Sequence, residues 1–154
     1  MKGGKDETMK MIKFVPEQLM KYWSHVRECI VLALPPYTTI DTDNIIRIQE
    51  RLLSGSLECW ACMNDEKEIL FGVVTTQIVV DEITETKNLL LFSVTMTEEH
   101  ENSAWQEGYE YLSAYAKSKG CSAIIAYTNQ ESVIMLAKNL GADVGWHFLK
   151  FPLI

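Results

Sequence analysis

The sequence predicts an α+β domain with a mixed, mostly antiparallel sheet and about four helices. Two apolar stripes at helical spacing precede residue 55, and three apolar runs separated by polar turns fill residues 57–97. A helix, a short apolar strand and a second helix follow. This order of elements is typical of a sheet with helices packed against it. The length of 154 residues fits one domain, so we expect a flexible leader over residues 1–10 and one domain over residues 11–154.

The first elements predict a short strand followed by a helix. We expect the strand over residues 11–15, and Pro16 and Glu17 suit the first turn of the helix. Leu19, Trp23, Val26 and Ile30 recur at helical spacing and form one apolar stripe. Two consecutive prolines at residues 35–36 end this helix.

A second helix is predicted between the two prolines and the strand region. Asp41 or Thr42 provides the N-cap, and Gly55 suits a left-handed C-terminal position. The apolar stripe of this helix consists of Ile45, Ile48 and Leu52.

The middle of the chain predicts an antiparallel three-stranded meander. The strands are expected over residues 57–63, 69–80 and 89–97, with polar connections at residues 64–67 and 81–88.

The last part predicts a helix over residues 103–119, a strand over 121–128, a helix over 131–140 and a final strand over 144–151. Because a whole helix joins the strands at 89–97 and 123–128, we expect them to be parallel neighbours. The family resemblance described below implies in addition that they diverge at their carboxyl ends. Buried positions are expected on the helical stripes: Trp23, Trp105, Leu112, and Leu136 or Ala137.

Composition excludes several classes of function. The net charge of −7 disfavours nucleic acid and anionic membranes as partners, because both are bound by clustered Lys and Arg. No apolar run approaches the ~20 residues of a membrane-spanning helix, and residues 1–13 do not resemble a signal peptide. We therefore expect a cytoplasmic protein with reduced thiols.

Cys59 and Cys62 form a C-x-x-C motif that could indicate a metal or redox site. Both residues lie in a predicted strand, where side chains three positions apart point to opposite faces of the sheet. We expect two buried thiols and no metal site.

The order of elements resembles the GNAT superfamily, the GCN5-related N-acetyltransferases, over residues 11–154. The most specific match joins Asn129-Gln130-Glu131-Ser132 to Lys138-Asn139-Leu140-Gly141-Ala142. The resemblance implies a cleft between residues 89–97 and 123–128 that binds acetyl-CoA or another acyl-CoA. It also implies transfer of the acyl group to an amine of a small molecule or a protein.

The sequence departs from this family where the cofactor pyrophosphate would bind. Residues 97–104 contain no glycine but include Glu98, Glu99 and Glu101, and no Lys or Arg occurs between Lys87 and Lys117. Carboxylates in the first turn of a helix compete with phosphate for the free amides. The tyrosine that many members use as an acid is replaced by Leu136 or Ala137. We therefore expect weak cofactor binding.

The candidate site residues follow from this resemblance. Asp81 and Glu98 are the candidate catalytic bases, with Glu82, Glu99 and His100 as further candidates. The candidate cofactor-binding residues are Val94, Thr95, Met96, Asn102, Ser103, Asn129 and Ser132.

The alternative is a catalytically inactive GNAT-fold module for interaction or dimerisation. The short, acidic chain also resembles GNAT-like proteins of tailed bacteriophages. Under either reading, a homodimer is one expected assembly.

Overall fold

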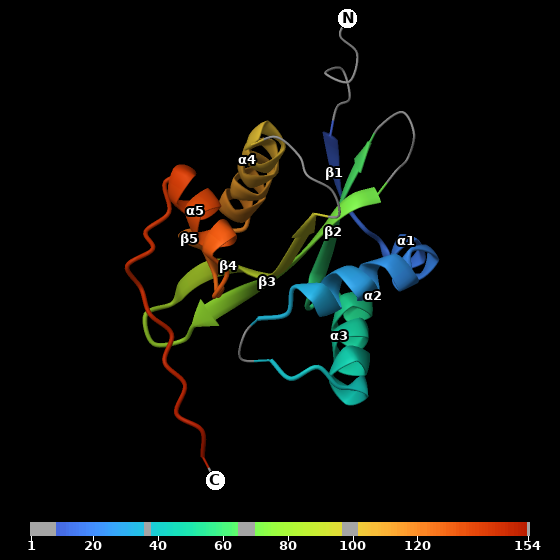
Figure 1. The fold of residues 1–154 in the computed structure, drawn as a ribbon, viewed down its shortest axis with the longest axis horizontal. Coiled ribbons are helices and arrows are strands. Elements are labelled where there is room, and N and C mark those ends of the chain that lie inside the picture. Colours follow the sequence, from blue (N-terminus) through green and yellow to red (C-terminus); the bar gives the residue numbers. More distant parts are fainter. Residues whose placement is uncertain (1–8, 36–37, 65–69, 97–101, 154) are drawn as a thin grey trace, which may run out of the picture.

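The computed structural model describes residues 9–35, 38–64, 70–96 and 102–153 (Figure 1). Within them, helices and strands follow in this order: β1 (Met9–Lys13), α1 (Pro16–Lys21), α2 (Trp23–Leu32), α3 (Thr42–Ser54), β2 (Glu58–Asn64), β3 (Leu70–Asp81), β4 (Thr86–Met96), α4 (Asn102–Ser118), β5 (Ala123–Ala126) and α5 (Glu131–Asn139).

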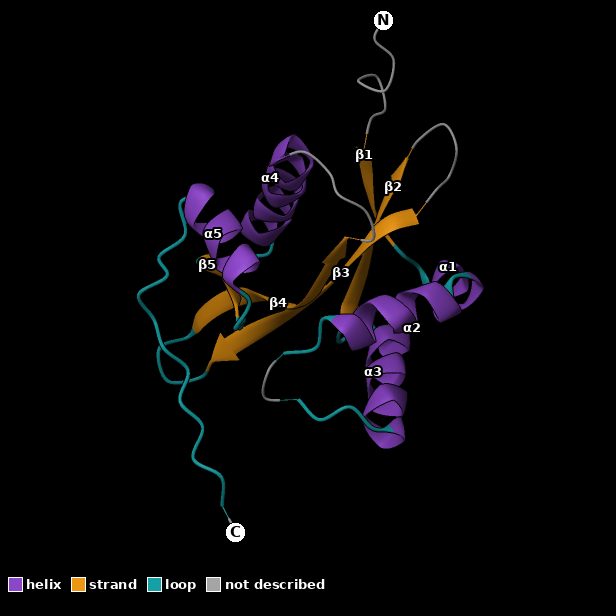
Figure 2. Ribbon diagram, in the orientation of Figure 1, coloured by secondary structure: helices purple, strands orange, loops and turns teal. Residues whose placement is uncertain are grey.

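The strands form one mixed sheet in the order β1-β2-β3-β4-β5 (Figure 2). Strands β1 to β4 are antiparallel neighbours, whereas β5 runs parallel to β4. The expected meander and the expected parallel pair are both confirmed. The α+β class with a mixed, mostly antiparallel sheet that the sequence predicts is therefore the observed architecture.

Helices cover the two faces of the sheet separately, with α1, α2 and α3 on one face and α4 on the other (Figure 1). The alternation along β2 supplies both cores. Ala61 belongs to the cluster with Leu19 and Val26, while Trp60 belongs to the cluster with Leu112. A strand that is apolar on both faces thus joins the two layers.

The single first helix predicted from the continuous apolar stripe is wrong. Tyr22 separates α1 from α2 with backbone angles φ −105° and ψ 16°, and its ring stacks on Phe14 at a centroid distance of 5.4 Å. The stripe continues across the break, and Val26 and Ile30 are fully buried. The spacing of apolar residues does not reveal such a break, because both short helices pack on the same core.

The second predicted helix is confirmed as α3. Asp41 is its N-cap, and its carboxylate accepts a hydrogen bond of 2.8 Å from the backbone N–H of Asn44. Gly55 ends the helix with φ +86°, a left-handed conformation that glycine adopts without strain.

The final strand predicted over residues 144–151 is also wrong, since residues 141–153 form no helix or strand. The structure assigns no strand to this segment, although its apolar and aromatic residues suit one. Strand β5 is correspondingly shorter than predicted.

Burial of the helical stripes is only partly as expected. Leu112 is buried at 5% exposure, whereas Trp23, Trp105, Leu136 and Ala137 are half-buried. Helix α5 contains no buried residue, because no further layer covers it.

A polar network connects α4 to the sheet. The Tyr115 hydroxyl donates a short hydrogen bond to Oε2 of Glu58, and Lys13 Nζ lies 3.1 Å from the same oxygen. The other oxygen, Oε1, accepts a 3.0 Å hydrogen bond from Thr76 Oγ1, which itself accepts one of 2.9 Å from Trp60 Nε1. The Glu58 side chain is only 11% exposed, and its carboxylate has partners from three elements: β1, β3 and α4.

Burial, and then the hydrogen bond to Glu58, raise the pKa of Tyr115. The folded protein therefore favours the neutral phenol. This contribution to stability is fully present below the ordinary tyrosine pKa of about 10 and is lost as the pH rises beyond it.

We predict that Tyr115→Phe lowers the free energy of unfolding by about 1–3 kcal/mol at pH 7, because Glu58 loses a donor while it stays largely buried. Denaturant melts measure this loss, which should shrink above about pH 10. Tyr111→Phe is the matched control, since Tyr111 is 52% exposed and its ring also meets the edge of Trp60. Equal stability of Tyr115→Phe and the unmodified protein at pH 7 would contradict the network's role.

Candidate functional site

The candidate site begins where β4 and β5 stop pairing. The parallel ladder covers four residue pairs, from Asn88 with Ala123 to Leu91 with Ala126. Strand β4 continues to Met96 and remains paired with β3 up to Gly72. Beyond Leu91, the β5 side of β4 therefore has no strand partner among the described residues. Backbone N–H and C=O groups that no strand pairs need another partner.

A β-bulge marks the same position. Leu91 pairs with Thr76 and Ser93 pairs with Thr75, so Phe92 is the extra residue on β4. Phe92 packs against the core beneath α1, α2 and α3, and Ser93 Oγ lies 2.6 Å from Thr75 Oγ1 in a buried hydroxyl pair. A bulge bends its strand and increases the local twist, and here it coincides with the end of the pairing between β4 and β5.

The end of β4 is held from both layers. Thr95 Oγ1 donates a 2.8 Å hydrogen bond to the backbone carbonyl of Cys29 in α2. Val94 packs against the core beneath α4. The Thr95 side chain is thus engaged with α2, so this residue can serve a ligand in the opening through its backbone.

The residues that follow β5 lie beyond the other end of the same parallel ladder. Thr128 Oγ1 accepts a 3.1 Å hydrogen bond from the backbone N–H of Gln130, which turns the chain into α5. Asn129 and Ser132 are exposed in this turn and in the first turn of α5. Their polar side chains lie at the carboxyl end of β5, where ligands bind in open sheets of this kind.

The predicted site residues do not all come together. Val94, Thr95 and Met96 end β4, and Asn102 and Ser103 begin α4. Glu98, with Glu99, His100 and Glu101, lies outside the described residues.

Asp81 lies at the other end of the sheet, because it pairs with Thr86 while Met96 pairs with Gly72. The distance along β3 is roughly 30 Å. Asp81 Oδ1 accepts hydrogen bonds from the backbone N–H groups of Ile83 and Thr84 at 2.9 and 3.2 Å. The structure therefore gives Asp81 a role in the β3–β4 turn and does not bring it to the opening.

A hollow of about 210 Å³ lies on the α3 side of the sheet. It is lined by Arg47, Ile48, Arg51, Ser56, Leu57, Gln77 and Phe92. Phe92 connects it to the point where β4 leaves β5. Sequence reasoning did not identify this hollow, although the spacing of Arg47 and Arg51 places both cations on one side of α3.

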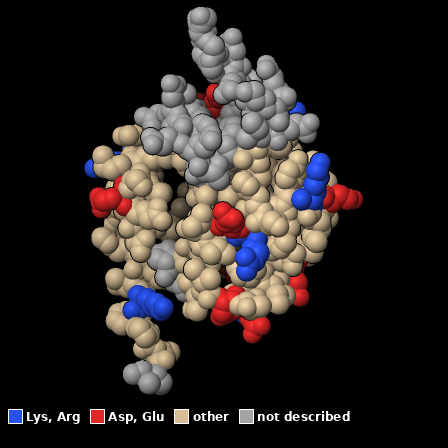
Figure 3. All heavy atoms as spheres, turned by 45° about the vertical axis from the view of Figure 1, so that its right-hand side comes forward, with Lys and Arg blue, Asp and Glu red and all other residues tan. Residues whose placement is uncertain are grey.

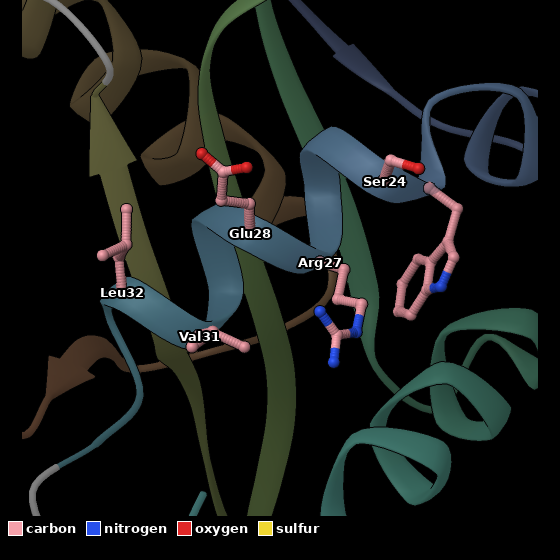
Figure 4. Close-up of a pocket in the computed structure, with 6 residues that line it drawn as sticks. Ser24, Arg27, Glu28, Val31 and Leu32 are labelled. Atoms are coloured by element: carbon pink, nitrogen blue, oxygen red, sulfur yellow. The ribbon is translucent and has the colours of Figure 1, made fainter. Parts of the chain in front are cut away.

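A larger hollow of about 390 Å³ lies along the outer surface of α2 (Figure 4). All of its lining residues, from Trp23 to Leu32, belong to this one helix. Arg27 and Glu28 point to different sides of the helix (Figure 4). Because it has no second wall, we do not include this surface in the site.

The two cysteines of the C-x-x-C motif are buried, as predicted. Cys59 packs in the core beneath α1, α2 and α3, whereas Cys62 packs in the core beneath α4. Burial raises the pKa of each thiol to about 12. Within the described ranges, no group of three or more His, Cys, Asp or Glu residues could hold a metal ion.

Comparison with solved structures identifies the architecture. A probable acetyltransferase is similar with a TM-score of 0.72 and 12% identity, covering 94% of this chain and 97% of the other. The ribosomal-protein-alanine N-acetyltransferase from Brucella melitensis biovar Abortus 2308 has a TM-score of 0.70 and 11% identity, covering 95% of this chain and 99% of the other. The aminoglycoside N-acetyltransferase AAC(6')-Iy, in complex with CoA, has a TM-score of 0.70 and 13% identity, covering 97% of each chain. The chain has the GNAT fold.

No protein-family model and no curated protein matches the sequence. The likeness to GNAT acetyltransferases therefore lies in the arrangement of the elements, at identities of 11–13% for these three structures. In the part of this GNAT fold that the structure describes, no helix is long and apolar enough to cross a membrane.

We predict a clear order of cysteine alkylation at pH 8. Cys121 is half-buried and should react first, whereas Cys29, Cys59 and Cys62 are buried with raised pKa values and should react much more slowly. Mass spectrometry of iodoacetamide-treated native protein measures the order, and unfolded protein provides the control. Rapid joint labelling of Cys59 and Cys62, or their oxidation to a shared disulfide, would contradict their separation by the sheet.

Proposed function

We propose that the protein is an N-acyltransferase that moves an acyl group from acyl-CoA to an amine. The observation that carries this proposal is the end of the parallel ladder at Leu91, beyond which β4 continues without β5 as a neighbour. The GNAT fold supports it, because solved neighbours are acetyltransferases and AAC(6')-Iy is in complex with CoA.

The residues of the opening fit an extended amide-bearing ligand. The backbone of Phe92–Met96 offers donors and acceptors on the β5 side, in the way that an open sheet edge receives an added strand. Asn129 and Ser132 offer polar side chains from the opposite wall. Asn102 and Ser103 begin α4, where free amides attract phosphate. When bound, acyl-CoA supplies an acyl group activated as a thioester.

We retain Glu98 as the proposed general base, because it follows the last residue of β4 by two positions. A carboxylate there would accept the proton that the amine loses as it attacks the acyl carbon. Asp81 is not part of this proposal, because its carboxylate serves the distant β3–β4 turn.

The charge near the proposed phosphate site opposes tight binding. Glu98, Glu99 and Glu101 precede α4, and the nearest cations in sequence are Lys87 and Lys117. We therefore predict that acetyl-CoA binds with a dissociation constant on the order of 0.1 mM or weaker, equivalent to about 5.5 kcal/mol or less. Replacing all three glutamates with glutamine should tighten binding, because it removes repulsion of the phosphates.

Titration calorimetry measures both dissociation constants. Glu82→Gln is the control, since Glu82 is exposed in the distant β3–β4 turn and should leave the affinity unchanged. Micromolar binding by the unmodified protein would contradict the charge argument while supporting the acyltransferase. Absence of binding by both the unmodified and the triple variant would contradict the acyltransferase itself.

We further propose that the acceptor is an amine that also carries an acidic group. The hollow beside Phe92 holds Arg47 and Arg51, and none of its lining residues is acidic. Arg47 Nη1 donates a 2.7 Å hydrogen bond to Asn44 Oδ1, and neither arginine forms an ion pair with a described carboxylate. Guanidinium groups bind carboxylates and phosphates in a bidentate manner.

Two electrostatic effects compete for the acceptor. The net charge of −7 attracts cations from a distance, but salt screens such interactions beyond about 8 Å. At contact distance the positive charges of the two arginines dominate the interaction with the acceptor, and they repel a polycation. We therefore expect this chain to differ in acceptor from its aminoglycoside-acetylating neighbour.

We predict that the dipeptide Ala-Glu is acetylated with a higher kcat/KM than kanamycin, measured by release of CoA. Arg51→Gln should lower kcat/KM for Ala-Glu by about tenfold, a loss near 1.4 kcal/mol, and leave that for the uncharged Ala-amide unchanged. Arg27→Gln on the outer surface of α2 is the matched control. Preference for kanamycin, or equal loss with both variants, would contradict the acidic acceptor.

A further inference from the structure

Strand β3 has a free edge over its last residues. Strand β2 pairs with β3 only as far as Glu58 with Thr76, whereas β3 continues to Asp81. From Gln77 onward, β3 keeps β4 as its neighbour and has no strand on its other side within the described residues (Figure 1). On that side, the backbone of residues 78–80 forms no backbone hydrogen bond with another described residue. Such an edge is a template for pairing with another chain.

The free edge of β3 lacks the usual protection against pairing. Its residues 77–80 are Gln-Ile-Val-Val, a mostly β-branched run without charge. The edge strand β1 instead carries Lys10 and Lys13, and lysine in particular protects sheet edges from pairing. Ile78 packs against the core beneath α4, and Val80, 53% exposed, follows on the same face. An added strand with apolar side chains on this face would cover them.

The hollow that contains the two arginines lies where this free edge begins. It is lined by Gln77 of β3, by Ser56 and Leu57 just before β2, and by Arg47 and Arg51 of α3, among others. Because side chains alternate between the faces of a sheet, a strand added beside Gln77 would point every second side chain toward α3. The free edge and the two guanidinium groups therefore meet at one place.

We propose that β3 beyond Thr76 binds an extended acidic segment of a partner protein by strand addition, with carboxylates of the segment on Arg47 and Arg51. The backbone of the segment would pair with residues 78–80, while pockets for alternate side chains give such complexes their specificity. The spacings agree, since residues four apart on a helix lie roughly 6 Å apart and residues two apart in a strand about 6.6 Å apart. Acidic residues at alternate positions thus match the two arginines.

The proposal rests on the acidic subsite of the proposed function, because both use Arg47 and Arg51. It adds the class of partner, which is a polypeptide, and a second set of contacts made by the backbone of β3. The binding itself requires no acyl-CoA. It can therefore be measured separately from catalysis.

Charge favours an acidic segment over other occupants of this edge. A second copy pairing through the same edge about a twofold axis would bring its own Arg47 and Arg51 to the same place, where like charges repel. Nucleic acid and anionic membranes require clustered basic side chains. On the face drawn in Figure 3, the basic side chains of described residues are scattered among acidic and uncharged ones. Glu82 and Glu85 lie in the turn at the far end of the edge, so carboxylates are favoured only beside the hollow.

Titration of isotope-labelled protein with the peptide Ac-Thr-Val-Glu-Val-Glu-Val-Thr-amide tests the proposal. At about 0.15 M salt, long-range repulsion by the net charge of −7 is screened. We expect saturable amide shift changes in residues 77–81 and slower hydrogen exchange at alternate amides of this range. The same peptide with glutamine at both glutamates should bind about tenfold more weakly, as should the glutamate peptide to Arg51→Gln. Arg27→Gln on the outer surface of α2 is the matched control and should bind like the unmodified protein.

A third peptide, with proline at the central valine, separates strand addition from attraction between charges. Proline removes a backbone donor and disfavours a strand, so this peptide should bind at least about tenfold more weakly at the same charge. Equal binding by the proline peptide overturns strand addition, and equal binding by the glutamine peptide overturns recognition of the carboxylates.

Two further outcomes concern the edge itself. Absence of saturable changes in residues 77–81 overturns the proposal even if Ala-Glu is acetylated, whereas peptide binding without any acetylation supports it and contradicts only the proposed function. A dimeric unmodified protein whose amides at residues 78–80 are already protected also overturns it, because a second copy would then occupy the edge.

Discussion

Pairing between β4 and β5 ends after Leu91 and Ala126, and the candidate site depends on this one change in the sheet. Up to that point β4 is an interior strand whose backbone is satisfied on both sides. Beyond it, β4 remains bonded to β3 but presents its other side to the opening. The bulge at Phe92 provides a local cause, because the extra residue bends the strand where the parallel ladder stops. A ligand in the opening would restore the pairing that β5 no longer provides.

The rest of the molecule holds this opening in place. Thr95 attaches the end of β4 to α2, and Val94 anchors it in the core beneath α4. Farther along the sheet, Glu58 joins Lys13, Thr76 and Tyr115, so α4 is fixed to three strands by charge and hydrogen bonds. A rigid scaffold on both sides of a strand allows its free edge to keep one geometry. Preorganisation of this kind lowers the cost of ordering a binding site.

Much of the fold could be predicted from local signals in the sequence. Asp41 and Gly55 mark the ends of α3, and the helix between two apolar runs predicts the parallel pair. Other features depend on contacts between distant residues. Stacking of Tyr22 on Phe14 accompanies the break between α1 and α2, and the register of β4 against β3 creates the bulge at Phe92. Neither contact leaves a periodic signal in the sequence.

The sequence predicts the neighbouring strands at the candidate site better than it predicts which side chains gather there. The crossover after β4 predicts the parallel pairing of β4 with β5 that the structure shows, whereas Asp81 lies at the opposite end of β3 and serves the β3–β4 turn. The hollow at Arg47 and Arg51 leaves no signal in the sequence, because its lining comes from α3, the residues before β2, and strands β3 and β4. The strand predicted over residues 144–151 illustrates a further limit. Composition shows that a segment suits a strand, but pairing requires an available edge.

The central claim is that ligand binding begins where β4 loses β5 as its neighbour. Amide chemical-shift changes on titration with acetyl-CoA test this claim most directly. We expect the changes to concentrate in Phe92–Met96 and in residues 127–132, with little change in Asn88–Leu91, whose amides already lie within the paired part of the sheet. Changes confined to the β1 edge or to the outer surface of α2, with none beyond Leu91, would contradict the account.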